Sequence, residues 1–382
     1  MQEFFFDPCE FPAAVISLRR EVRAFLDDWL RNATPIQRAQ SWVGFDREFS
    51  RLVGARGWIG MTWPNKYGGA GRSGLERYVV LEEMLAAGAP VAAHWFGDRQ
   101  SGPQLLRFGT ERQCQEILPR IARGELVFAV GLSEPDAGSD LAAIRTRALP
   151  VRGGWSVNGS KLWTTNAHRA DYMIALLRTE LPTENRHSGL SQFLIDMTWP
   201  GINVRPIEDL TGEVHFNEVF FDNLFLPQES LVGQLGEGWQ QAMAELAYER
   251  SGPERFMSSI QVLFLMIREL SGKATEEETI EIGRLVSELS TLRRMSISVA
   301  GMLDLGRNPS IEAAIVKDLG ARFEQLLPEV AQRLLEIVPS VDAQNDLQKV
   351  LAYIIAMAPA YSLRGGAREI LRGIVAQRLE VR

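Results

Sequence analysis

The sequence predicts an α+β protein of several domains, with helical regions at both ends and a β-rich region between them. In residues 12–30 the apolar side chains recur at the spacing of one helix face, and the pattern returns in residues 75–87. From 127 to 234 the chain changes to short β-rich runs separated by Gly, Pro and Asn turns. After Gly238 the spacing is helical again. The predicted order is therefore helices, then strands, then helices.

The length of the chain supports a division into domains. With 382 residues, it exceeds the size at which one hydrophobic core usually suffices. We predict a helical N-terminal domain over residues 1–126, a β domain over 127–235 and a helical C-terminal domain over 236–382. Thr275 and Glu278 have the spacing of a capping box at the start of a long helix. The side chains expected on the buried side of that helix are Ile282, Leu285, Val286, Leu289, Leu292 and Val299.

Charge and composition exclude several classes of function. A formal net charge of -7 disfavours a nucleic-acid groove. Cys9 and Cys114 lie in dissimilar contexts, so we expect buried thiols in a reducing compartment. Without a signal-peptide pattern or an apolar run that could span a bilayer, we expect a cytoplasmic protein that does not insert into membranes. The histidines, His94, His168, His187 and His215, lack ligand spacing, so no metal site is expected.

Two segments of the β-rich region carry most of the information about function. The first, residues 128–140, runs a short apolar strand into a turn rich in Ser, Asp and Gly, where backbone amides and hydroxyls can face a ligand. The second, residues 157–166, is a β-rich pair around an Asn-Gly turn that then places Trp163 near a hydroxyl. A polar turn beside an aromatic plate suits a flat, partly anionic ring.

Together the two segments closely resemble the flavin-binding signature of the acyl-CoA dehydrogenase family. Residues 57–69 and 109–125 are similar to further family segments, so the resemblance covers nearly the whole chain. It implies a helical N-terminal domain, a middle β-barrel-like domain and a C-terminal four-helix bundle. It also implies FAD-dependent oxidation of an acyl-CoA thioester to the trans-2-enoyl-CoA. The electrons are then expected to pass to an electron-transfer flavoprotein.

The resemblance implies roles for individual residues of the two segments. Those expected to contact the isoalloxazine and pyrophosphate of FAD are Leu132, Ser133, Gly138 and Ser139, and Ser139 is also expected to contact the substrate. Trp163 is expected to lie against the flavin ring. Thr165 is expected to direct its hydroxyl at flavin N5, the atom that receives the hydride.

The catalytic base is the second question that the resemblance raises. Many members carry it as a Glu before Gly-Thr near the C-terminus, but here Gly365 occupies that position, followed by Gly366 and Ala367. Isovaleryl- and long-chain-type members carry the Glu on an earlier helix, followed by Arg, and Glu249-Arg250 matches that arrangement. The resemblance thus implies Glu249 as base, Arg250 near the CoA moiety and the Gly365 amide as a donor to the thioester carbonyl.

The residues around Glu249 favour the same assignment without the family. A helix from Gly238 would share one stripe among Ala242, Leu246, Glu249, Pro253, Phe256 and Ile260, with a kink at Pro253. A carboxylate on an apolar stripe is costly unless it is paired or functional. The alternative is a salt bridge of Glu249 with Arg250 or Arg255. Glu369 is a rival carboxylate, which we expect to be structural.

Two departures from the family pattern leave alternatives open. Ala367 stands where the family has a Thr that contacts FAD, and the acidic run 273–279 replaces the Arg-x-x-Phe-Gly segment that holds a neighbouring subunit's pyrophosphate. One alternative is a non-catalytic or FAD-poor partner subunit of a hetero-oligomeric dehydrogenase. Another is an acyl-CoA oxidase or flavin monooxygenase that uses oxygen. We expect a homo-oligomer, a dimer or tetramer, with a hetero-oligomer as the other possibility.

Overall fold

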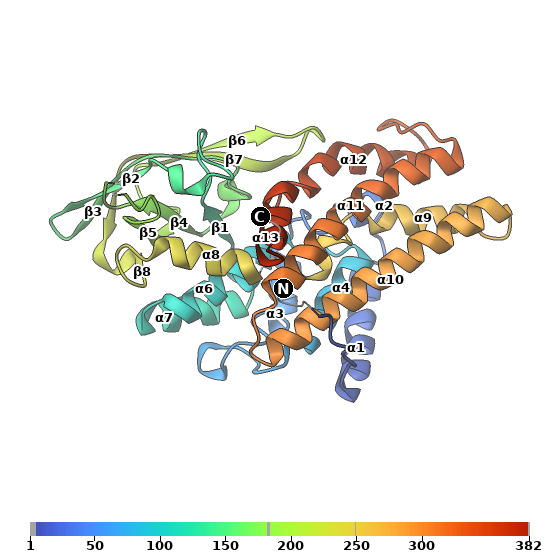
Figure 1. The fold of residues 1–382 in the computed structure, drawn as a ribbon, viewed down its shortest axis with the longest axis horizontal. Helices are drawn as coiled ribbons and strands as arrows, with labels where there is room; N and C mark the ends of the chain where they lie inside the picture. Colours follow the sequence, from blue (N-terminus) through green and yellow to red (C-terminus); the bar gives the residue numbers. More distant parts are fainter. Residues whose placement is uncertain (1–4, 182–183, 249, 381–382) are drawn as a thin grey trace. The chain divides into compact units, whose positions relative to one another are not determined.

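The computed structural model describes residues 5–181, 184–248 and 250–380, and the chain forms two compact units (Figure 1). Unit 1 comprises Met1–Gly44, Arg72–Val91 and Glu249–Arg382, and unit 2 comprises Phe45–Gly71 and Ala92–Tyr248. The fold is α+β, with helices before and after a central sheet along the chain, as predicted. The N-terminal helices are divided between the two units. The domain boundaries at residues 126 and 235 remain predictions.

Unit 1 is built from helices. Its helices are α1 (Ala13–Trp29), α2 (Pro35–Gln40), α4 (Gly74–Ala87), α9 (Ile260–Leu270), α10 (Glu276–Asp304), α11 (Ser310–Leu335), α12 (Asp346–Tyr361) and α13 (Arg368–Arg378). Figure 1 shows α11 running beside α10 and α12, and both pairs of helices are in contact. The long helices therefore pack side by side along their length.

Helix α10 begins at the predicted capping box. The Thr275 side chain accepts a hydrogen bond from the Glu278 amide, and the Glu278 side chain accepts one from the Thr275 amide. Leu285 and other predicted core residues of this helix are buried, but Val286 is 45% exposed, so that part of the prediction was wrong. Successive residues on a helix point about 100° apart, so the buried stripe through Leu285 turns Val286 away from the core.

Unit 2 carries the sheet. Its strands are β1 (Phe128–Gly131), β2 (Arg147–Val151), β3 (Gly154–Lys161), β4 (Tyr172–Arg178), β5 (Leu190–Asp196), β6 (Ile202–Glu208), β7 (Val214–Pro227) and β8 (Leu231–Val232). They are ordered β6-β7-β3-β2-β4-β5-β8, and β1 pairs with β4 in parallel. The helices of this unit are α3 (Arg47–Ala55), α5 (Ala92–Phe96), α6 (Gly102–Phe108), α7 (Glu111–Ala122) and α8 (Gly238–Tyr248), and α8 packs on β5.

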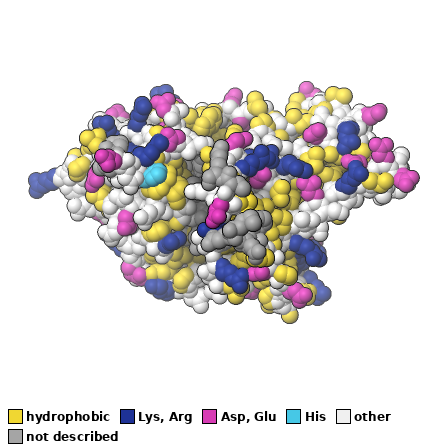
Figure 2. Space-filling model, in the orientation of Figure 1, with side chains coloured by type: hydrophobic (Ala, Val, Ile, Leu, Met, Phe, Trp, Pro, Cys, Tyr) yellow, Lys and Arg dark blue, Asp and Glu magenta, His cyan; other side chains and the backbone are white. Residues whose placement is uncertain are grey.

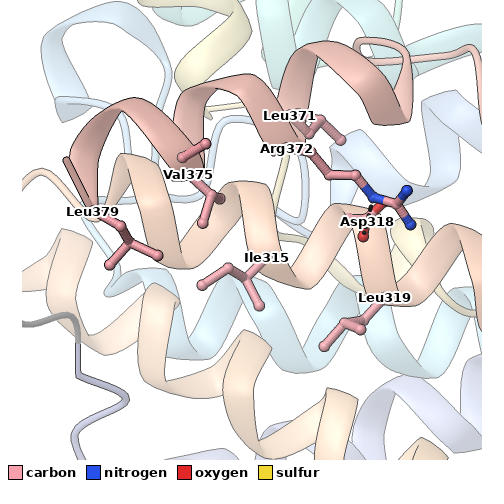
Figure 3. A pocket seen from close by; sticks show the side chains of 8 residues that line it. Ile315, Asp318, Leu319, Leu371, Arg372, Val375 and Leu379 are labelled. Carbon is pink, nitrogen blue, oxygen red and sulfur yellow. Dashed lines mark hydrogen bonds and ion pairs between the residues drawn. The ribbon is translucent and has the colours of Figure 1, made fainter. Parts of the chain in front are cut away.

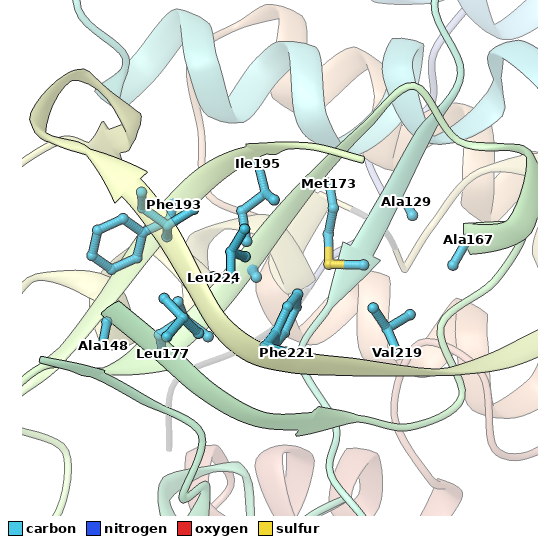
Figure 4. Packing of buried hydrophobic residues seen from close by; sticks show 13 residues of the cluster. Ala129, Ala148, Ala167, Met173, Leu177, Phe193, Ile195, Val219, Phe221 and Leu224 are labelled. Atoms are coloured by element: carbon cyan, nitrogen blue, oxygen red, sulfur yellow. The ribbon is translucent and has the colours of Figure 1, made fainter. Parts of the chain in front are cut away.

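The core of unit 2 lies among the side chains of several strands (Figure 4). Phe193 of β5 and Phe221 of β7 are its large members, packed with Met173 and Leu177 of β4. Strands β4 and β5 are buried along almost their whole length. A strand covered on both faces needs apolar residues at successive positions, not alternate ones. This burial explains the continuous apolar run of β4, whereas β5 also buries the polar Ser191 and Gln192.

The helix that begins at Gly238 is shorter than predicted. Helix α8 ends at Tyr248, and a single 3-10 turn, Pro253–Arg255, precedes the start of α9 at Ile260. Gly252 is extended, with φ -71° and ψ 167°, and Pro253 starts the turn because it lacks an amide hydrogen and has a fixed φ. The predicted single stripe reaching Pro253 and Ile260, and the predicted kink, were therefore wrong.

Of the two thiols that were expected to be buried, Cys114 is buried and Cys9 is half-buried. On the face shown in Figure 2, acidic and basic side chains are interspersed among hydrophobic ones. Cys9 and Cys114 are both free thiols, and burial raises the pKa of Cys114 above its usual value. Among the helices that the structure describes, none is both long and apolar enough to pass through a bilayer.

Candidate active site

Strand β1 runs into a tight turn that displays the first predicted flavin-binding segment. Glu134 and Ala137 exchange two backbone hydrogen bonds, of 2.9 and 3.1 Å, and Pro135 restricts the backbone between them. Gly138 and Ser139 are exposed, and a Cβ at Gly138 would meet no described atom within 4 Å. The backbone and hydroxyl of this turn are therefore accessible to a ligand.

After β3 the chain turns to present Trp163. This residue has a φ of 59°, in the left-handed region that bulky side chains rarely adopt. Its side chain is 56% exposed and packs edge-on against Phe216 of β7, with 5.9 Å between the ring centroids. A strained backbone that keeps a large aromatic ring in solvent is typical of a binding site. Trp163 is placed to serve as a plate for a planar ligand.

Strand β7 fixes the turn that carries Thr165. The Thr164 amide donates to the Asn217 carbonyl at 3.0 Å, and the Asn217 side chain donates back to the Thr164 carbonyl at 3.0 Å. On the other side, the Asn166 amide donates to the His215 carbonyl at 2.9 Å. Because both neighbours of Thr165 are anchored, β7 determines where its hydroxyl lies.

The two predicted segments are joined directly to each other. The Leu162 amide donates to the Ser133 carbonyl at 2.9 Å. The Lys161 ammonium donates to the Leu132 carbonyl at 3.1 Å and to a Glu134 carboxylate oxygen at 2.8 Å. Both carbonyls of the expected flavin contacts Leu132 and Ser133 are thus bound by the residues that lead into the Trp163 turn. The structure therefore joins the two segments by hydrogen bonds within unit 2.

The polar groups of these two joined segments fit a flavin. Within the described part of the chain, the buried Thr164 hydroxyl and the Asn166 side-chain oxygen have no hydrogen-bond partner. Buried polar atoms are normally paired, because an unpaired one costs free energy. The exposed amides and hydroxyl of Gly138 and Ser139 suit an anionic or polar group, and the Trp163 ring suits an aromatic one. The residues of unit 2 can therefore hold FAD.

Gly365 lies in unit 1, in the turn between α12 and α13. Its φ is 70°, and that of Gly366 is 100°. A Cβ at Gly365 would lie 2.9 Å from the guanidinium carbon of Arg255, whose side chain is 2% exposed. A side chain at position 365 would meet both an unfavourable φ and a buried cation. A Glu at this position would have to displace the Arg255 guanidinium and adopt a strained φ, which disfavours it.

A buried network holds the turn in place. Glu324 of α11 is fully buried and accepts hydrogen bonds from Arg364 and from the Ser258 amide, both at 2.8 Å. Arg364 also donates to the Ser258 hydroxyl at 2.7 Å and lies over the Trp42 ring, 4.4 Å from its centroid. The chain entering Gly365 is therefore anchored to α11 and to the segment before α9.

The remaining candidates of unit 1 are placed as follows. Glu249 lies outside the described residues. A guanidinium nitrogen of the half-buried Arg250 lies 3.8 Å from the position of a Cβ on Gly366. Glu369 is exposed in the first turn of α13, where a carboxylate complements the helix dipole. The acidic residues 276–278 form the first turn of α10 in the same way.

A pocket between α11 and α13 contains none of the predicted site residues (Figure 3). Its lining is Ile315, Asp318, Leu319, Leu371, Arg372, Val375, Ala376 and Leu379. The carboxylate of Asp318 is paired with Arg368 at 2.6 Å and with Arg372 at 3.4 Å. With its only carboxylate bound by two arginines and the rest of its lining mainly apolar, this pocket offers no group for proton abstraction.

Comparison with known proteins places the chain in a family. Residues 14–125 match the acyl-CoA dehydrogenase N-terminal domain, and residues 129–224 match the acyl-CoA dehydrogenase middle domain. The acyl-CoA dehydrogenase IpdE1 of Mycobacterium tuberculosis is 32% identical over 96% of this chain and 97% of its own length. The acyl-CoA dehydrogenase FadE34 of the same species is also 32% identical, but the match covers 85% of this chain and only 44% of FadE34.

A solved structure described as the Tcur3481-Tcur3483 steroid ACAD has a TM-score of 0.87 and 26% identity, and 98% of each chain is covered. The chain belongs to the acyl-CoA dehydrogenase family, as the sequence predicts. It is therefore an oxidoreductase of that family, and its cofactor is FAD.

Reasoning from the sequence missed the residues that support the site. Lys161 and Glu134 lie inside the two predicted flavin-binding segments, but the sequence analysis gave them no role. Phe216 and Asn217 lie on β7, whose sequence gave no sign of a function. A Lys at the end of an inward-facing strand and a Glu just after another strand are signals that could have suggested an ion pair. Nothing in the sequence indicates that Phe216 and Asn217 contact the turn that carries Trp163.

Proposed function

We propose that this chain oxidises an acyl-CoA thioester to the trans-2-enoyl-CoA and passes the electrons to an electron-transfer flavoprotein. The observation that carries the proposal is the bond between the Leu162 amide and the Ser133 carbonyl, which sets the exposed Trp163 ring beside an accessible polar turn. Such a surface supports a planar cofactor whose ring and phosphates need different partners. Family membership supports the reaction class.

Each residue of the proposed site has a defined task. When bound, FAD supplies the acceptor for the β-hydride of the substrate. Trp163 and the polar turn at Ser133 orient the cofactor, and the Thr165 hydroxyl donates a hydrogen bond at its edge. Glu249 removes the α-proton, and the Gly365 amide stabilises the negative charge that develops on the thioester oxygen. A site from which water is excluded would raise the pKa of the base toward neutrality.

The assignment of the base to Glu249 is supported by the rejection of its rivals. Position 365 carries a glycine at a positive φ beside the buried Arg255. Glu369 is exposed on α13 and is suited to the helix start. Of the carboxylates that the family pattern brings into question, Glu249 is the one that neither observation excludes.

The proposed reaction can be tested by anaerobic mixing of the purified flavoprotein with a panel of acyl-CoA thioesters. We expect loss of the visible flavin absorbance with at least one class, because the flavin is reduced when it accepts the hydride. Absence of bleaching with every class contradicts the proposal. Restored activity with electron-transfer flavoprotein supports it as the acceptor, whereas stoichiometric peroxide under air would identify an oxidase instead.

A second candidate function is that of one subunit in a hetero-oligomeric enzyme for ring-bearing thioesters. The similar structure joins two proteins, Tcur3481 and Tcur3483, in a steroid ACAD. In this chain Ala367 provides no side-chain hydrogen bond at the start of α13, and acidic residues occupy the first turn of α10. We therefore include a steroid side-chain CoA thioester in the panel. Co-purification with a homologous chain supports this candidate, and full flavin content and turnover in the lone protein contradict it.

A further inference from the structure

Lys161 is a fully buried cation at the end of β3. Its ammonium donates to the Leu132 carbonyl at 3.1 Å and to Glu134 Oε1 at 2.8 Å. Ordinary surface lysines leave their charge in water, and a buried one needs a partner and a reason. Here both acceptors belong to the first flavin-binding segment, and Lys161 is two residues before Trp163. The cation therefore connects the two segments from inside the domain.

Glu134 is the centre of the network around this cation. Its side chain is 8% exposed, and its two carboxylate oxygens accept hydrogen bonds from the Arg145 amide at 2.6 Å and the Thr146 amide at 3.0 Å, in addition to Lys161. The Thr146 hydroxyl donates to the Ser160 carbonyl at 2.9 Å, on the strand that carries Lys161. The carboxylate thus binds two backbone amides and the Lys161 ammonium near the polar turn.

Burial acts against the charge of both members of this pair. Burial lowers the pKa of Lys161 to about 8, although Glu134 acts in the opposite direction. For Glu134, burial raises the pKa, but the nearby Lys161 and the Arg145 amide bring it below its usual value. The desolvation of the cation therefore outweighs what its partner returns, as is common for buried pairs. What the pair does provide is a set of bonds that join the Leu132 carbonyl and the Arg145 and Thr146 amides to the end of β3.

We propose that Lys161 and Glu134 form a positioning pair that sets the Leu132–Ser133 carbonyls against the Trp163 turn and thereby determines how tightly FAD is held. The inference rests on the proposed function only in that FAD occupies this surface. The pair does not touch the reacting atoms, so neither residue is a catalytic residue. Its removal should loosen the junction between the two segments while the core in Figure 4 remains intact.

The test uses the full chain with both charges removed, in the variant Lys161→Met/Glu134→Gln. We expect a folded protein by circular dichroism, with an FAD dissociation constant raised about 10–100-fold, the range seen when residues that orient binding groups are removed. In the apoprotein, hydrogen exchange should become faster at the Leu162 and Thr146 amides. The single variant Lys161→Met leaves Glu134 bound to the Arg145 and Thr146 amides and should also weaken FAD binding, which covers the case in which the double variant does not fold.

Arg178→Met is the matched control. Arg178 is the other buried cation of the sheet, but its guanidinium donates to the carbonyls of Ala142, Ile144 and Ser188, outside the two segments. It should lower stability while the FAD affinity of the folded protein stays within about twofold of wild type. Unchanged FAD affinity in the double variant, or unchanged exchange at Leu162, overturns the positioning role. Wild-type protein that binds FAD but is not bleached contradicts the proposed function and leaves the pair's role standing.

Discussion

The Trp163 region of unit 2 and the Gly365 turn of unit 1 both depend on a buried charge, but they are built differently. In unit 2 the charges of Lys161 and Glu134 lie within the two segments that they join, and the carboxylate binds backbone amides nearby in the chain. In unit 1 the turn at Gly365 is held by Glu324, which belongs to another helix. The first arrangement is local in sequence, and the second depends on tertiary packing.

This difference predicts whether loss of each network affects ligand binding or the stability of the fold. A local network moves with its own segments, so its loss should affect the ligand more than the fold. A network that joins α11 to the end of α12 is part of the helical core, so its loss should affect the fold first. Five predictions test this contrast, beginning with the largest expected effect.

Removal of the Arg364 charge should destabilise unit 1 strongly. Arg364→Met leaves Glu324 fully buried without its ionic partner, which typically costs about 3–5 kcal/mol of unfolding free energy. Chemical denaturation of the apoprotein measures it. The double variant Arg364→Met/Glu324→Gln should recover part of the loss, and a double variant no better than the single one would show that the charge of Glu324 is not the cause.

A side chain at position 365 should be poorly tolerated. In Gly365→Ala, the methyl group meets a φ of 70° and the buried Arg255 guanidinium, which together cost about 2 kcal/mol. Gly373→Ala in α13 is the matched control, because its Cβ meets no described atom within 4 Å, and it should stabilise the helix by about 0.5–1 kcal/mol. Equal effects in the two variants would contradict the account of this turn.

FAD affinity should depend on pH through Lys161. Because the pKa of Lys161 in the folded protein is about 8, its charge is present below that pH and is lost above it, next to Glu134 and Arg178. We expect FAD binding to weaken by up to about tenfold, or 1.4 kcal/mol, between pH 7 and 9 (about one unit on each side of the pKa). Fluorescence titration measures it, and the variant Lys161→Met/Glu134→Gln should show no such change.

The free energy of unfolding should depend on pH in the opposite direction to FAD affinity. The unfolded chain keeps the Lys161 proton up to its ordinary pKa of 10.5, whereas the folded protein loses it at about 8. Between these values the unfolded state holds more protons, so the contribution of Lys161 to the free energy of unfolding rises with pH. Unfolding of the apoprotein, compared with the double variant across this window, isolates that contribution. A contribution that falls with pH would mean that the pair stabilises the fold.

A hydroxyl at position 367 should have the smallest effect. Ala367 is the N-cap of α13 and makes no side-chain hydrogen bond there. Ala367→Thr supplies the missing cap and should raise the unfolding free energy by about 1 kcal/mol. If the same hydroxyl also contacts FAD, as in the family pattern, FAD affinity should rise as well. No gain in stability would show that the cap geometry at this position is unfavourable.

The sequence predicted the elements that local patterns encode. Helix α10 begins at its capping box, and the runs that became β4, β5, β6 and β7 are strands, since turn chemistry and apolar periodicity act over a few residues. The helix from Gly238 was predicted too long because periodicity alone does not show where it stops, which is at Tyr248, before Gly252 and Pro253. The sequence singled out the two segments as candidates for flavin binding, but not the bond that joins them, between the Leu162 amide and the Ser133 carbonyl.

The supporting contacts were not predictable for a physical reason. Phe216 and Asn217 reach the Trp163 turn only because β7 pairs with β3, and this pairing joins residues far apart in the chain. The same holds for Glu324 and Arg364, whose contact is set by helix packing. Residue spacing within one sequence does not show which distant residues come into contact. The contact between Arg255 and the Gly365 turn likewise joins residues far apart in the chain, so the sequence alone does not show it.

The central proposal is that the polar turn and Trp163 of unit 2 hold the cofactor and that Glu249 supplies the catalytic base. One measurement tests it most directly: wild type and Glu249→Gln are loaded with FAD to equal content and mixed anaerobically with the most reactive acyl-CoA. We predict equal FAD affinity and a rate of flavin bleaching about 10²–10⁴-fold lower in the variant, the usual contribution of a general base. Bleaching at the wild-type rate in Glu249→Gln would contradict the account.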